Sequence, residues 1–340
     1  MRAIHITRYG GPDVLEVREQ PDPVPGPGEV RVRVRATGLN FAELMARQGL
    51  YPDAPKPPCV VGYEAAGVID AVGQGVPSDL AVGTRVIALT RFGAHAEAVV
   101  VSTAQIHRIP EAMSFEEAAA LPVVYLTAYH ILFRTASLRP GSRVLVHMAG
   151  GGVGLAAVQL CRTVPNVVVF GTASAAKHAF LREQGFDHCI DYRSADYVQE
   201  VRRLTSNEGV DLVLDPLGGD DWKKGYDLLR PAGMLVAFGF ANMATGEKRN
   251  LFHVARNYFK VPKFSPMTMM DKNRAVAGVN MGHLWQEIEM LNGEMRELLA
   301  LYAAGKIKPT VDSVFNFDQA AAAHRRMHER KNIGKVVLVP

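Results

Sequence analysis

The sequence predicts an α/β protein of two domains, in which a doubly wound parallel sheet is joined to a smaller β-rich domain. Three observations support this prediction. The chain has 340 residues, which is the length of about two domains of roughly 150 residues each. Its first third consists of short β-branched runs punctuated by glycine and proline, a pattern typical of a small barrel or sandwich. From residue 143 onward, short apolar runs alternate with helical stretches, as in the βαβ units of a parallel sheet.

Composition and charge fit a globular protein and exclude several other classes. Apolar residues make up 48% of the chain, which is too many for a disordered protein. The 38 basic and 34 acidic residues leave a net charge of +4, too mild for a dedicated nucleic-acid binder. Residues 1–11 lack the apolar core of a signal peptide. The three cysteines, Cys59, Cys161 and Cys189, lie too far apart in the sequence to suggest a disulfide framework, so we expect a cytoplasmic protein.

The first domain is expected over residues 1–122. A stiff loop rich in proline and glycine, residues 21–28, leads into Glu29–Arg35, where valine and arginine alternate strictly. This alternation predicts a strand with one face in water. Further short runs such as Arg85–Ala88 follow between glycines, and we expect them to complete a small twisted barrel or sandwich.

The second domain is expected over residues 123–305. Six apolar runs are interpreted as buried strands: Val144–His147, Val167–Gly171, Cys189–Asp191, Leu212–Asp215, Leu235–Gly239 and Ala275–Val279. Helices are predicted between them at Leu155–Arg162, Ala175–Gln184, Ala195–Leu204 and Trp222–Leu229. A long helix over Leu284–Ala304 should end at Gly305. The tail, residues 306–340, is again β-rich, with strands at Val314–Phe317 and Lys335–Val339 around a helix at Gln319–His328, so we expect it to return to the first domain.

The strongest chemical signal is a glycine loop between the first strand and first helix of the second domain. Ala149, Gly151 and Gly154 occupy the three positions of a G-x-G-x-x-G pattern. Such a turn lets backbone N–H groups, here including those of Gly152 and Val153, meet a pyrophosphate at a helix N-terminus. The same glycines interrupt the charge-free run of residues 144–161, which is therefore interpreted as strand, turn and helix and not as a membrane span.

The residues after the second strand favour NADPH over NADH. An NAD site usually carries Asp or Glu about 20 residues beyond the glycines, where it holds the ribose hydroxyls. Residues 171–177 contain no acid. Ser174 and Lys177 are candidates to receive a 2′-phosphate instead, as are Tyr192 and Arg193 after the third strand. On the alternative interpretation, Lys177 is a solvated helix residue.

Six segments carry a family resemblance: Pro25–Glu29, Gly38–Ala42, Gly62–Gly67, Thr127–Tyr129, Ala149–Gly154 and Gly334–Leu338. With them, the chain resembles the medium-chain dehydrogenase/reductase superfamily over nearly its full length, and within it the zinc-free quinone oxidoreductase group. A closer likeness to the vesicle amine transport protein branch rests on residues 40–51, 215–219, 246–251 and 329–334. The resemblance implies a GroES-like catalytic domain over residues 1–122, completed by 306–340, and an NADPH-binding Rossmann domain over 123–305. It also implies an active site in the cleft between the domains and a homodimer formed through the edge of the nucleotide-binding sheet.

The resemblance also assigns site residues. Zinc-dependent relatives carry Cys where Asn40 stands and His where Tyr63 stands, so we expect no metal. Glu64 matches a family position and is expected to be structural, whereas relatives often carry Asp at Glu43, so no role is transferred to it. Asn40 and Tyr51 match positions in the substrate cleft, where an amide or phenol can hydrogen-bond a substrate carbonyl; Tyr51 is alternatively a wall residue. The resemblance implies that four further residues lie close to the cofactor: Thr127, Gly239, Asn280 and Asn332.

The leading hypothesis is therefore metal-free, NADPH-dependent reduction of quinones or activated alkenes (enones). The alternative hypothesis is an NADPH-binding membrane or partner adaptor with little turnover. It rests on residues 248–270, which combine five Lys or Arg with many aromatic and Met side chains and no acid until Asp271. This segment is interpreted as a lid, as a dimer contact, or as a peripheral contact with anionic membrane.

Overall fold

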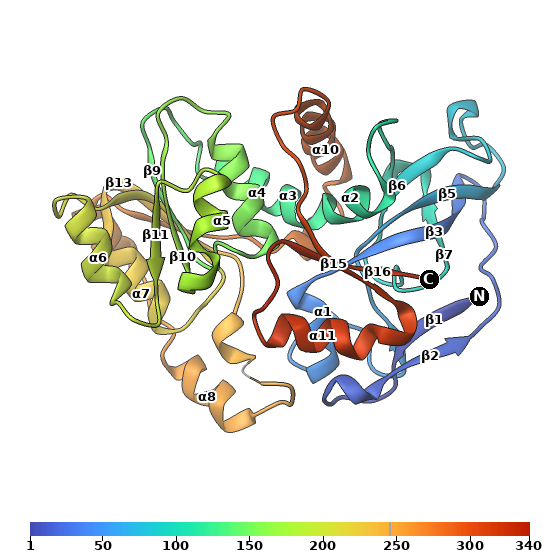
Figure 1. Cartoon of the computed structure of the whole chain (residues 1–340), viewed down its shortest axis with the longest axis horizontal. Coiled ribbons are helices and arrows are strands. Elements are labelled where there is room, and N and C mark those ends of the chain that lie inside the picture. The colour runs from blue at the N-terminus through green and yellow to red at the C-terminus, as the bar shows by residue number, and fades with distance from the viewer. Residues whose placement is uncertain (245) are drawn as a thin grey trace. The chain divides into compact units, whose positions relative to one another are not determined.

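The computed structural model describes residues 1–244 and 246–340, and its chain divides into two compact units (Figure 1). Unit 1 comprises Met1–Leu126, Gly246–Arg249 and Met281–Pro340. Unit 2 comprises Thr127–Thr245 and Asn250–Asn280. The chain first passes from unit 1 to unit 2 within the helix α3 (Pro122–Tyr129).

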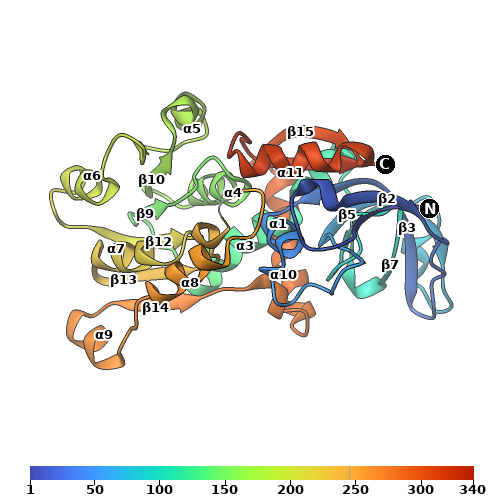
Figure 2. The same ribbon diagram turned by 90° about the horizontal axis from the view of Figure 1, so that it is seen from below.

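Unit 2 contains the predicted doubly wound parallel sheet. Its strands are β9 (Arg143–Val146), β10 (Val168–Ala173), β11 (His188–Asp191), β12 (Val210–Asp215), β13 (Leu229–Ala237) and β14 (Ala275–Gly278). They pair in the order β11-β10-β9-β12-β13-β14, and every pair is parallel. Figure 2 shows β10, β9, β12, β13 and β14 one after another across the sheet. The order reverses between β9 and β12, which is where open α/β sheets bind ligands.

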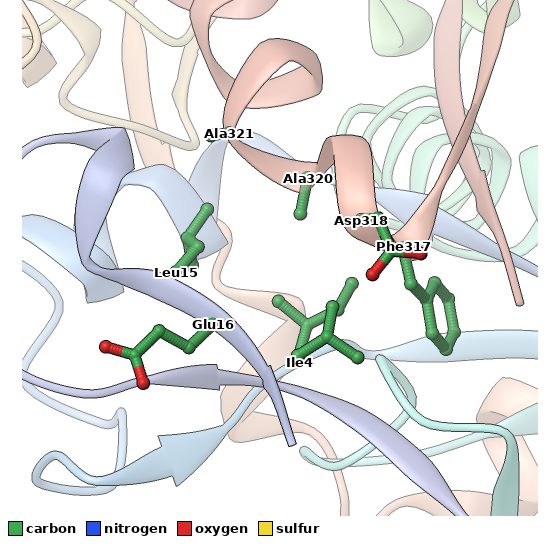
Figure 3. A pocket seen from close by; sticks show the side chains of 8 residues that line it. Ile4, Leu15, Glu16, Phe317, Asp318, Ala320 and Ala321 are labelled. Atoms are coloured by element: carbon green, nitrogen blue, oxygen red, sulfur yellow. The ribbon is translucent and has the colours of Figure 1, made fainter. Parts of the chain in front are cut away.

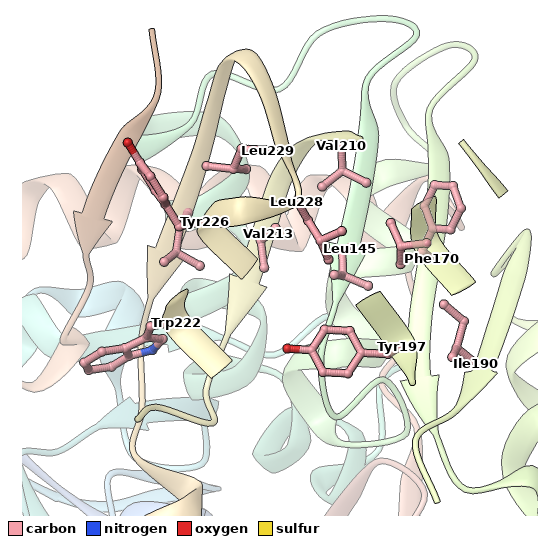
Figure 4. Packing of buried hydrophobic residues seen from close by; sticks show 12 residues of the cluster. Leu145, Phe170, Ile190, Tyr197, Val210, Val213, Trp222, Tyr226, Leu228 and Leu229 are labelled. Carbon is pink, nitrogen blue, oxygen red and sulfur yellow. The ribbon is translucent and has the colours of Figure 1, made fainter. Parts of the chain in front are cut away.

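Helices cover both faces of this sheet. Figure 1 draws α4 (Gly152–Cys161) and α5 (His178–Glu183) on one side and α6 (Tyr197–Leu204) and α7 (Asp220–Asp227) on the other. Behind α6 and α7 lies an almost wholly apolar core that includes Leu145, Phe170, Val213 and Leu235, all buried (Figure 4). The six predicted strands are confirmed. β13, however, begins six residues earlier than predicted, and α7 ends at Asp227 because the chain pairs with β12 from Leu229 on.

Unit 1 is the predicted β-rich domain. Its main sheet runs β15-β16-β3-β5-β6-β8, with β7 (Ala98–Ser102) also pairing with β3. A three-stranded sheet joins β2 (Leu15–Glu19), β1 (Arg2–Ile6) and β4 (Cys59–Val60). The strands of the main sheet are β3 (Glu29–Leu39), β5 (Glu64–Val72), β6 (Arg85–Leu89), β8 (Ile106–Arg108), β15 (Val311–Asn316) and β16 (Lys335–Val339). The helices α1 (Phe41–Gln48), α2 (Phe115–Ala120), α10 (Ile288–Ala303) and α11 (Ala320–His328) also belong to unit 1.

Two segments join unit 1 that the sequence assigned to the second domain. The first is α10, which starts four residues later than predicted, after a short turn at Met281–His283. It belongs to unit 1 because Asn292 donates to the carbonyl of Ala104, and Tyr302 to Glu117, both at 2.9 Å. The second is Gly246–Arg249, where Gln48 donates to the carbonyl of Gly246 at 2.8 Å. The unit boundaries therefore differ from the predicted domain boundaries of residues 122 and 306.

Candidate functional site

The glycine loop follows β9 at the carboxyl edge of the unit 2 sheet, as predicted. Gly151 caps α4, and its N–H bonds the carbonyl of Met148 at 2.8 Å, which closes the turn. A Cβ on Gly154 would lie 2.4 Å from the carbonyl oxygen of Ala149, so only glycine lets α4 start this close to the strand. The first N–H groups of α4, those of Gly152, Val153 and Gly154, have no carbonyl one helical turn before them and can bind an anion. The loop thus fits a dinucleotide pyrophosphate.

Lys177 lies directly against this loop. An ideal Cβ on Gly150 would be 2.8 Å from its Cδ and 3.5 Å from its Nζ. Ser174 precedes Lys177 in the turn that follows β10, and Tyr192 follows β11 with the Arg193 guanidinium 5.9 Å from its ring centre. These side chains therefore follow the carboxyl ends of neighbouring parallel strands, on the same edge of the sheet as the glycine loop.

The other unit 2 candidates also follow strand ends. Gly239 comes after β13, and a Cβ there would lie 2.9 Å from the carbonyl of Pro216, in the loop after β12. Asn280 comes after β14, next to Val279, which donates to Ala237 at 2.9 Å. Thr127 is 7% exposed within α3. The structure gathers Gly239 and Asn280 at the glycine-loop edge of the sheet, because all six strands are parallel.

Unit 1 holds a second polar centre, which the sequence did not predict. The strand β3 lies between β5 and β16 and is antiparallel to both. The carboxyl end of β3 therefore meets the amino ends of its two neighbours. This arrangement brings Asn40, just after β3, to Glu64 at the start of β5 and Lys335 at the start of β16. All three are buried, with Glu64 at 0% and Lys335 at 3% exposure.

Hydrogen bonds in this centre use both amide protons of Asn40. Its Nδ2 donates to Glu64 Oε1 at 3.0 Å and to Glu43 Oε1 at 3.2 Å. Lys335 Nζ donates to Asn40 Oδ1 and lies 2.5 Å from Glu64 Oε1. Because an amide group has two protons, none remains for a substrate carbonyl. The expectation that the Asn40 amide donates to the substrate is therefore wrong for this arrangement.

The two carboxylates have different partners. Glu64 Oε2 accepts the backbone N–H of Val123 at 2.7 Å, a contact that agrees with the structural role expected for Glu64. Glu43 Oε2 accepts the N–H of Asn40 at 2.8 Å and closes the first turn of α1. Burial raises the pKa of Glu43 to about 8, against the opposing effect of the Lys335 ammonium. Glu43 is thus held in a site that disfavours its charge.

Tyr51 lies in an aromatic group within unit 1. Its ring meets that of Tyr63 edge-on at 6.4 Å, and Tyr63 in turn packs on Phe92 at 5.2 Å. Burial raises the pKa of the Tyr63 phenol, and the nearby charge of Glu43 and contact with Tyr51 add to this effect. Asn332 is placed differently: its Nδ2 donates to the carbonyl of Gly334 at 3.0 Å and shapes the turn before β16. The structure thus gives Asn332 a local structural contact.

The residues present do not fit a zinc ion. An amide and a phenol stand at Asn40 and Tyr63, and the ammonium of Lys335 already neutralises Glu64 beside them. A dication at this point would face a fixed positive charge. Cys59 donates to the carbonyl of Pro55 at 3.3 Å, and within residues 1–244 and 246–340 no three His, Cys, Asp or Glu side chains cluster as ligands.

A cavity of about 310 Å³ in unit 1 lies apart from these residues (Figure 3). Ile4, Leu15 and Phe317 line it together with two carboxylates. Glu16 is paired with Arg18 at 2.8 Å and Asp318 with Arg2 at 3.3 Å. Since none of the predicted site residues lines this cavity, it has no part in the proposed chemistry.

One sequence signal points to the polar centre. A Cβ on Gly38 would lie 2.3 Å from Glu64 Oε1 and 2.5 Å from Lys335 Cε. A glycine inside a strand often marks such a close approach. The segments that carry the resemblance contain Gly38, Glu64 and Lys335, but only the pairing of β3 with β5 and β16 shows that they meet.

Two of the helices beyond the sheet expose apolar side chains. In the segment predicted as a lid or membrane contact, α8 (Leu251–Phe259) exposes Phe252 at 81% and Phe259 at 85%, and α9 (Pro266–Lys272) exposes Met267 at 74%. Lys260 pairs with Asp220 at 2.6 Å, so one of its five cations is partly neutralised. No helix among the described residues is both long and apolar enough to cross a membrane.

Known proteins resemble this chain over its whole length. The alcohol dehydrogenase GroES-like domain family matches residues 26–111, and the zinc-binding dehydrogenase family matches residues 184–338. The chain is 52% identical to the human synaptic vesicle membrane protein VAT-1 homolog, covering 100% of this chain and 86% of that protein. Among solved structures, the quinone oxidoreductase of Escherichia coli complexed with NADPH matches with a TM-score of 0.88 at 30% identity, covering 100% of both chains. The CurK enoyl reductase matches with a TM-score of 0.85 at 30% identity, covering 99% of this chain and 98% of the other.

The fold and these relatives define an oxidoreductase of two units, one GroES-like and one a Rossmann sheet. The chain belongs to the medium-chain dehydrogenase/reductase superfamily. Within it, the chain is quinone oxidoreductase-like and falls in the VAT-1 branch.

Proposed function

We propose that the protein reduces quinones or activated alkenes (enones) with NADPH and without a metal. The observation that carries this proposal is the side chain of Lys177, which lies across Gly150 of the glycine loop. An ammonium there suits a cofactor with an additional phosphate. The NADPH complex of the E. coli quinone oxidoreductase and the enoyl reductase CurK support the cofactor and the two substrate classes.

The bound cofactor would supply a hydride, and the chain would bind and orient the reactants. The glycine loop and α4 would hold the pyrophosphate of the cofactor, and Ser174, Lys177 and Tyr192 would contact its 2′-phosphate. When hydride reaches a conjugated carbonyl compound, negative charge develops on its oxygen. The phenol of Tyr51 is the proposed donor to this oxygen, since the amide protons of Asn40 are occupied.

The test is NADPH oxidation by the purified full chain against a panel of quinones and enones. We expect turnover of at least one member, slower turnover with NADH, and no change on adding a zinc chelator. Inhibition by the chelator would overturn the metal-free mechanism. Tight NADPH binding without turnover of any member would favour the adaptor.

The adaptor hypothesis has its own observation, the exposed apolar side chains of α8 and α9 among several cations. Aromatic side chains beside Lys and Arg suit an anionic membrane surface. The adaptor predicts salt-sensitive co-sedimentation with anionic liposomes, lost in Phe252→Ser/Phe259→Ser. Val24→Ser, which removes an 83% exposed side chain of unit 1, is the control and should bind as the unchanged protein does. Failure to pellet with anionic vesicles at low salt would leave the lid or dimer interpretation of this segment.

We also propose a cytoplasmic homodimer. The strand β14 ends the order of the unit 2 sheet, so its outer edge presents unpaired backbone groups to a second copy. Light scattering after size-exclusion chromatography tests this: a dimer of the 37.0 kDa chain has twice that mass. A monomer at micromolar concentration would overturn it.

A further inference from the structure

A short stretch of chain, the strap (Gly246–Arg249), belongs to unit 1, whereas the helix α8 that follows it belongs to unit 2. Two neighbouring side chains of α1 hold the strap by its backbone. Gln48 donates to the carbonyl of Gly246 at 2.8 Å, and Arg47 donates to the carbonyl of Glu247 at 3.2 Å. The position of the strap therefore depends on the orientation of Arg47.

The orientation of Arg47 is set by two histidines of α11. Arg47 is fully buried, its Nε donates to Nδ1 of His324 at 3.3 Å, and its Nη2 contacts Nε2 of His328. Its Nη1 also donates to the carbonyl of Gly10. A guanidinium has only donors, so each of the two ring nitrogens must accept with a lone pair. Both imidazoles must therefore be neutral, with the proton on Nε2 in His324 and on Nδ1 in His328.

A proton on either acceptor would remove a contact of Arg47 and place a second positive charge beside the guanidinium. His324 is 1% exposed, and its Nε2 has no hydrogen-bond partner among the described residues, so a cation there would be poorly solvated. Burial, Arg47 and the nearby ring of His95 hold the pKa of His324 well below its usual value. His328 is only half-buried, and burial and the Arg47 charge lower its pKa from 6.5 to about 4. Protons from water therefore reach the cluster at His328.

The charged groups on the neighbouring elements are already engaged. The carboxylates of Asp13 and Glu247 favour the charge of Arg47, and Arg325 on α11 opposes it. Arg325 is itself paired with both of these carboxylates. Two carboxylates and two guanidiniums thus balance, and a proton on His328 adds an excess positive charge. The carboxylates of the other elements packed against α11 have arginine partners: Asp312 pairs with Arg326, and Asp318 with Arg2.

We propose that the strap is released in acid, because protonation of His328 breaks the contact that orients Arg47. The strap leads directly into α8, which exposes Phe252 and Phe259 in the segment predicted as a lid, dimer contact or membrane contact. Acid would thus loosen the attachment of this segment at its N-terminal end. The proposal concerns regulation, and it depends neither on the substrate nor on turnover.

Proton linkage gives the size of the effect. The bound strap keeps His328 neutral, so this part of its stability is present above pH 6.5 and is lost as the pH falls toward 4. When the strap is released, the ring returns to its ordinary pKa of 6.5. The equilibrium constant for release should therefore rise about tenfold between pH 7.5 and 5.5.

Limited proteolysis with papain, which is active over this pH range, measures the release. The rate of cleavage within the strap is divided by the rate for a free peptide of residues 246–252, which corrects for the pH dependence of the protease. We expect this ratio to be about tenfold higher at pH 5.5 than at pH 7.5, with the cuts mapped to the strap by mass spectrometry. An equal ratio at the two pH values would overturn the proposal.

Two variants separate local release from a general opening of unit 1. His328→Gln keeps an acceptor for Arg47 but does not titrate, so its cleavage ratio should not change with pH. His107→Gln is the control, because it removes a buried histidine with a pKa of about 4 that lies beside Asn292 and not beside Arg47. It should keep the full increase. An increase that persists in His328→Gln, or that disappears in His107→Gln, would contradict the assignment of the switch to His328.

A second measurement uses the unchanged protein and needs no cleavage. In protein labelled with 15N-histidine, the shifts of the ring nitrogens distinguish the two neutral tautomers, and the signals of His328 are those missing in His328→Gln. We expect His328 to carry its proton on Nδ1 at neutral pH, since its Nε2 accepts from Arg47. A proton on Nε2 instead, or an imidazolium at neutral pH, would overturn the proposal.

Discussion

The buried regions of the two units are stabilised in different ways. The unit 2 sheet buries apolar side chains such as Leu145 and Val213, and its candidate binding groups stand at strand ends, many of them backbone N–H groups. Unit 1 instead buries an ammonium, the carboxylate of Glu64, the carboxyl group of Glu43 and an amide at the meeting point of three strands. The stability of the unit 2 region therefore depends on how well its apolar side chains pack. The stability of the unit 1 centre depends on its charged and polar groups all being present together.

Stability is expected to respond to different changes in these regions. An apolar core loses free energy in proportion to the side-chain volume removed. A buried ionic centre responds to any change that separates its partners or alters their protonation. The predictions below use this contrast, beginning with the change expected to have the largest effect.

Gly38→Ala should directly disrupt the buried polar centre of unit 1. The new Cβ would lie 2.3 Å from Glu64 Oε1, 2.5 Å from Lys335 Cε and 2.7 Å from the Ala119 carbonyl, so the ion pair must move. We expect a loss of about 3 kcal/mol in the free energy of unfolding, measured with urea. Gly278→Ala, where nothing lies within 4 Å, is the control and should change little. A loss below about 1 kcal/mol in the free energy of unfolding would mean that the centre accommodates an added methyl group as an adaptable apolar core does.

The pH dependence of stability should distinguish the two regions next. The pKa of Glu43 is about 8 in the folded protein, against 4.5 for an ordinary glutamate. Between these values the folded chain holds a proton that the unfolded chain releases, so stability falls as pH rises through this window. Glu43→Gln should remove up to about 1.4 kcal/mol of this fall per pH unit. Urea unfolding of both proteins from pH 5 to 8 measures the difference, and parallel curves would refute the prediction.

At acid pH the sign reverses. Burial lowers the pKa of His95 and His107, both in unit 1, to about 4. Their unfolded forms take up protons first, so stability should fall again as pH drops from about 6.5 to 4. Where the two windows overlap, from about pH 4.5 to 6.5, the two histidines outweigh the single glutamate, so the protein should be most stable near pH 6.5.

The sequence predicted the two regions unequally, for a physical reason. In unit 2 each signal is local: a run of apolar residues, a glycine turn and a helix follow one another along the chain, and all six strands were predicted. In unit 1 the partners lie far apart, with Lys335 and Asn40 separated by 295 residues. Alternation in Glu29–Arg35 predicted β3, but no local pattern shows which strands flank it. Asn40 was accordingly interpreted as a donor to substrate, although its protons are used by Glu43 and Glu64.

Cofactor selection tests whether unit 2 depends on side-chain charge as well as on shape. Lys177→Ala should raise the NADPH dissociation constant about tenfold or more, since a charge-assisted contact contributes roughly 1.5–3 kcal/mol. The NADH constant should change much less. Arg182→Ala, an exposed cation on α5, is the control and should leave both constants unchanged. Fluorescence titration with each cofactor measures the two dissociation constants. Equal affinities for NADPH and NADH in the unchanged protein would refute the proposed preference for NADPH.

Tyr51→Phe should have the smallest effect and shows whether the unit 1 side chains take part in the chemistry. If the phenol donates to the oxygen on which charge develops, kcat and kcat/KM should fall together by up to about tenfold, the value of one neutral hydrogen bond. A rise in KM alone would make Tyr51 a wall of the pocket. Tyr63→Phe is the informative companion, because its ring packs on Tyr51 while its own phenol is buried. The same loss in Tyr63→Phe would mean that Tyr63 acts by positioning Tyr51, whereas normal turnover there would assign the proton-donating contact to Tyr51 alone. Either result would show that polar side chains of unit 1 contribute to the reaction as well as to the stability of the fold.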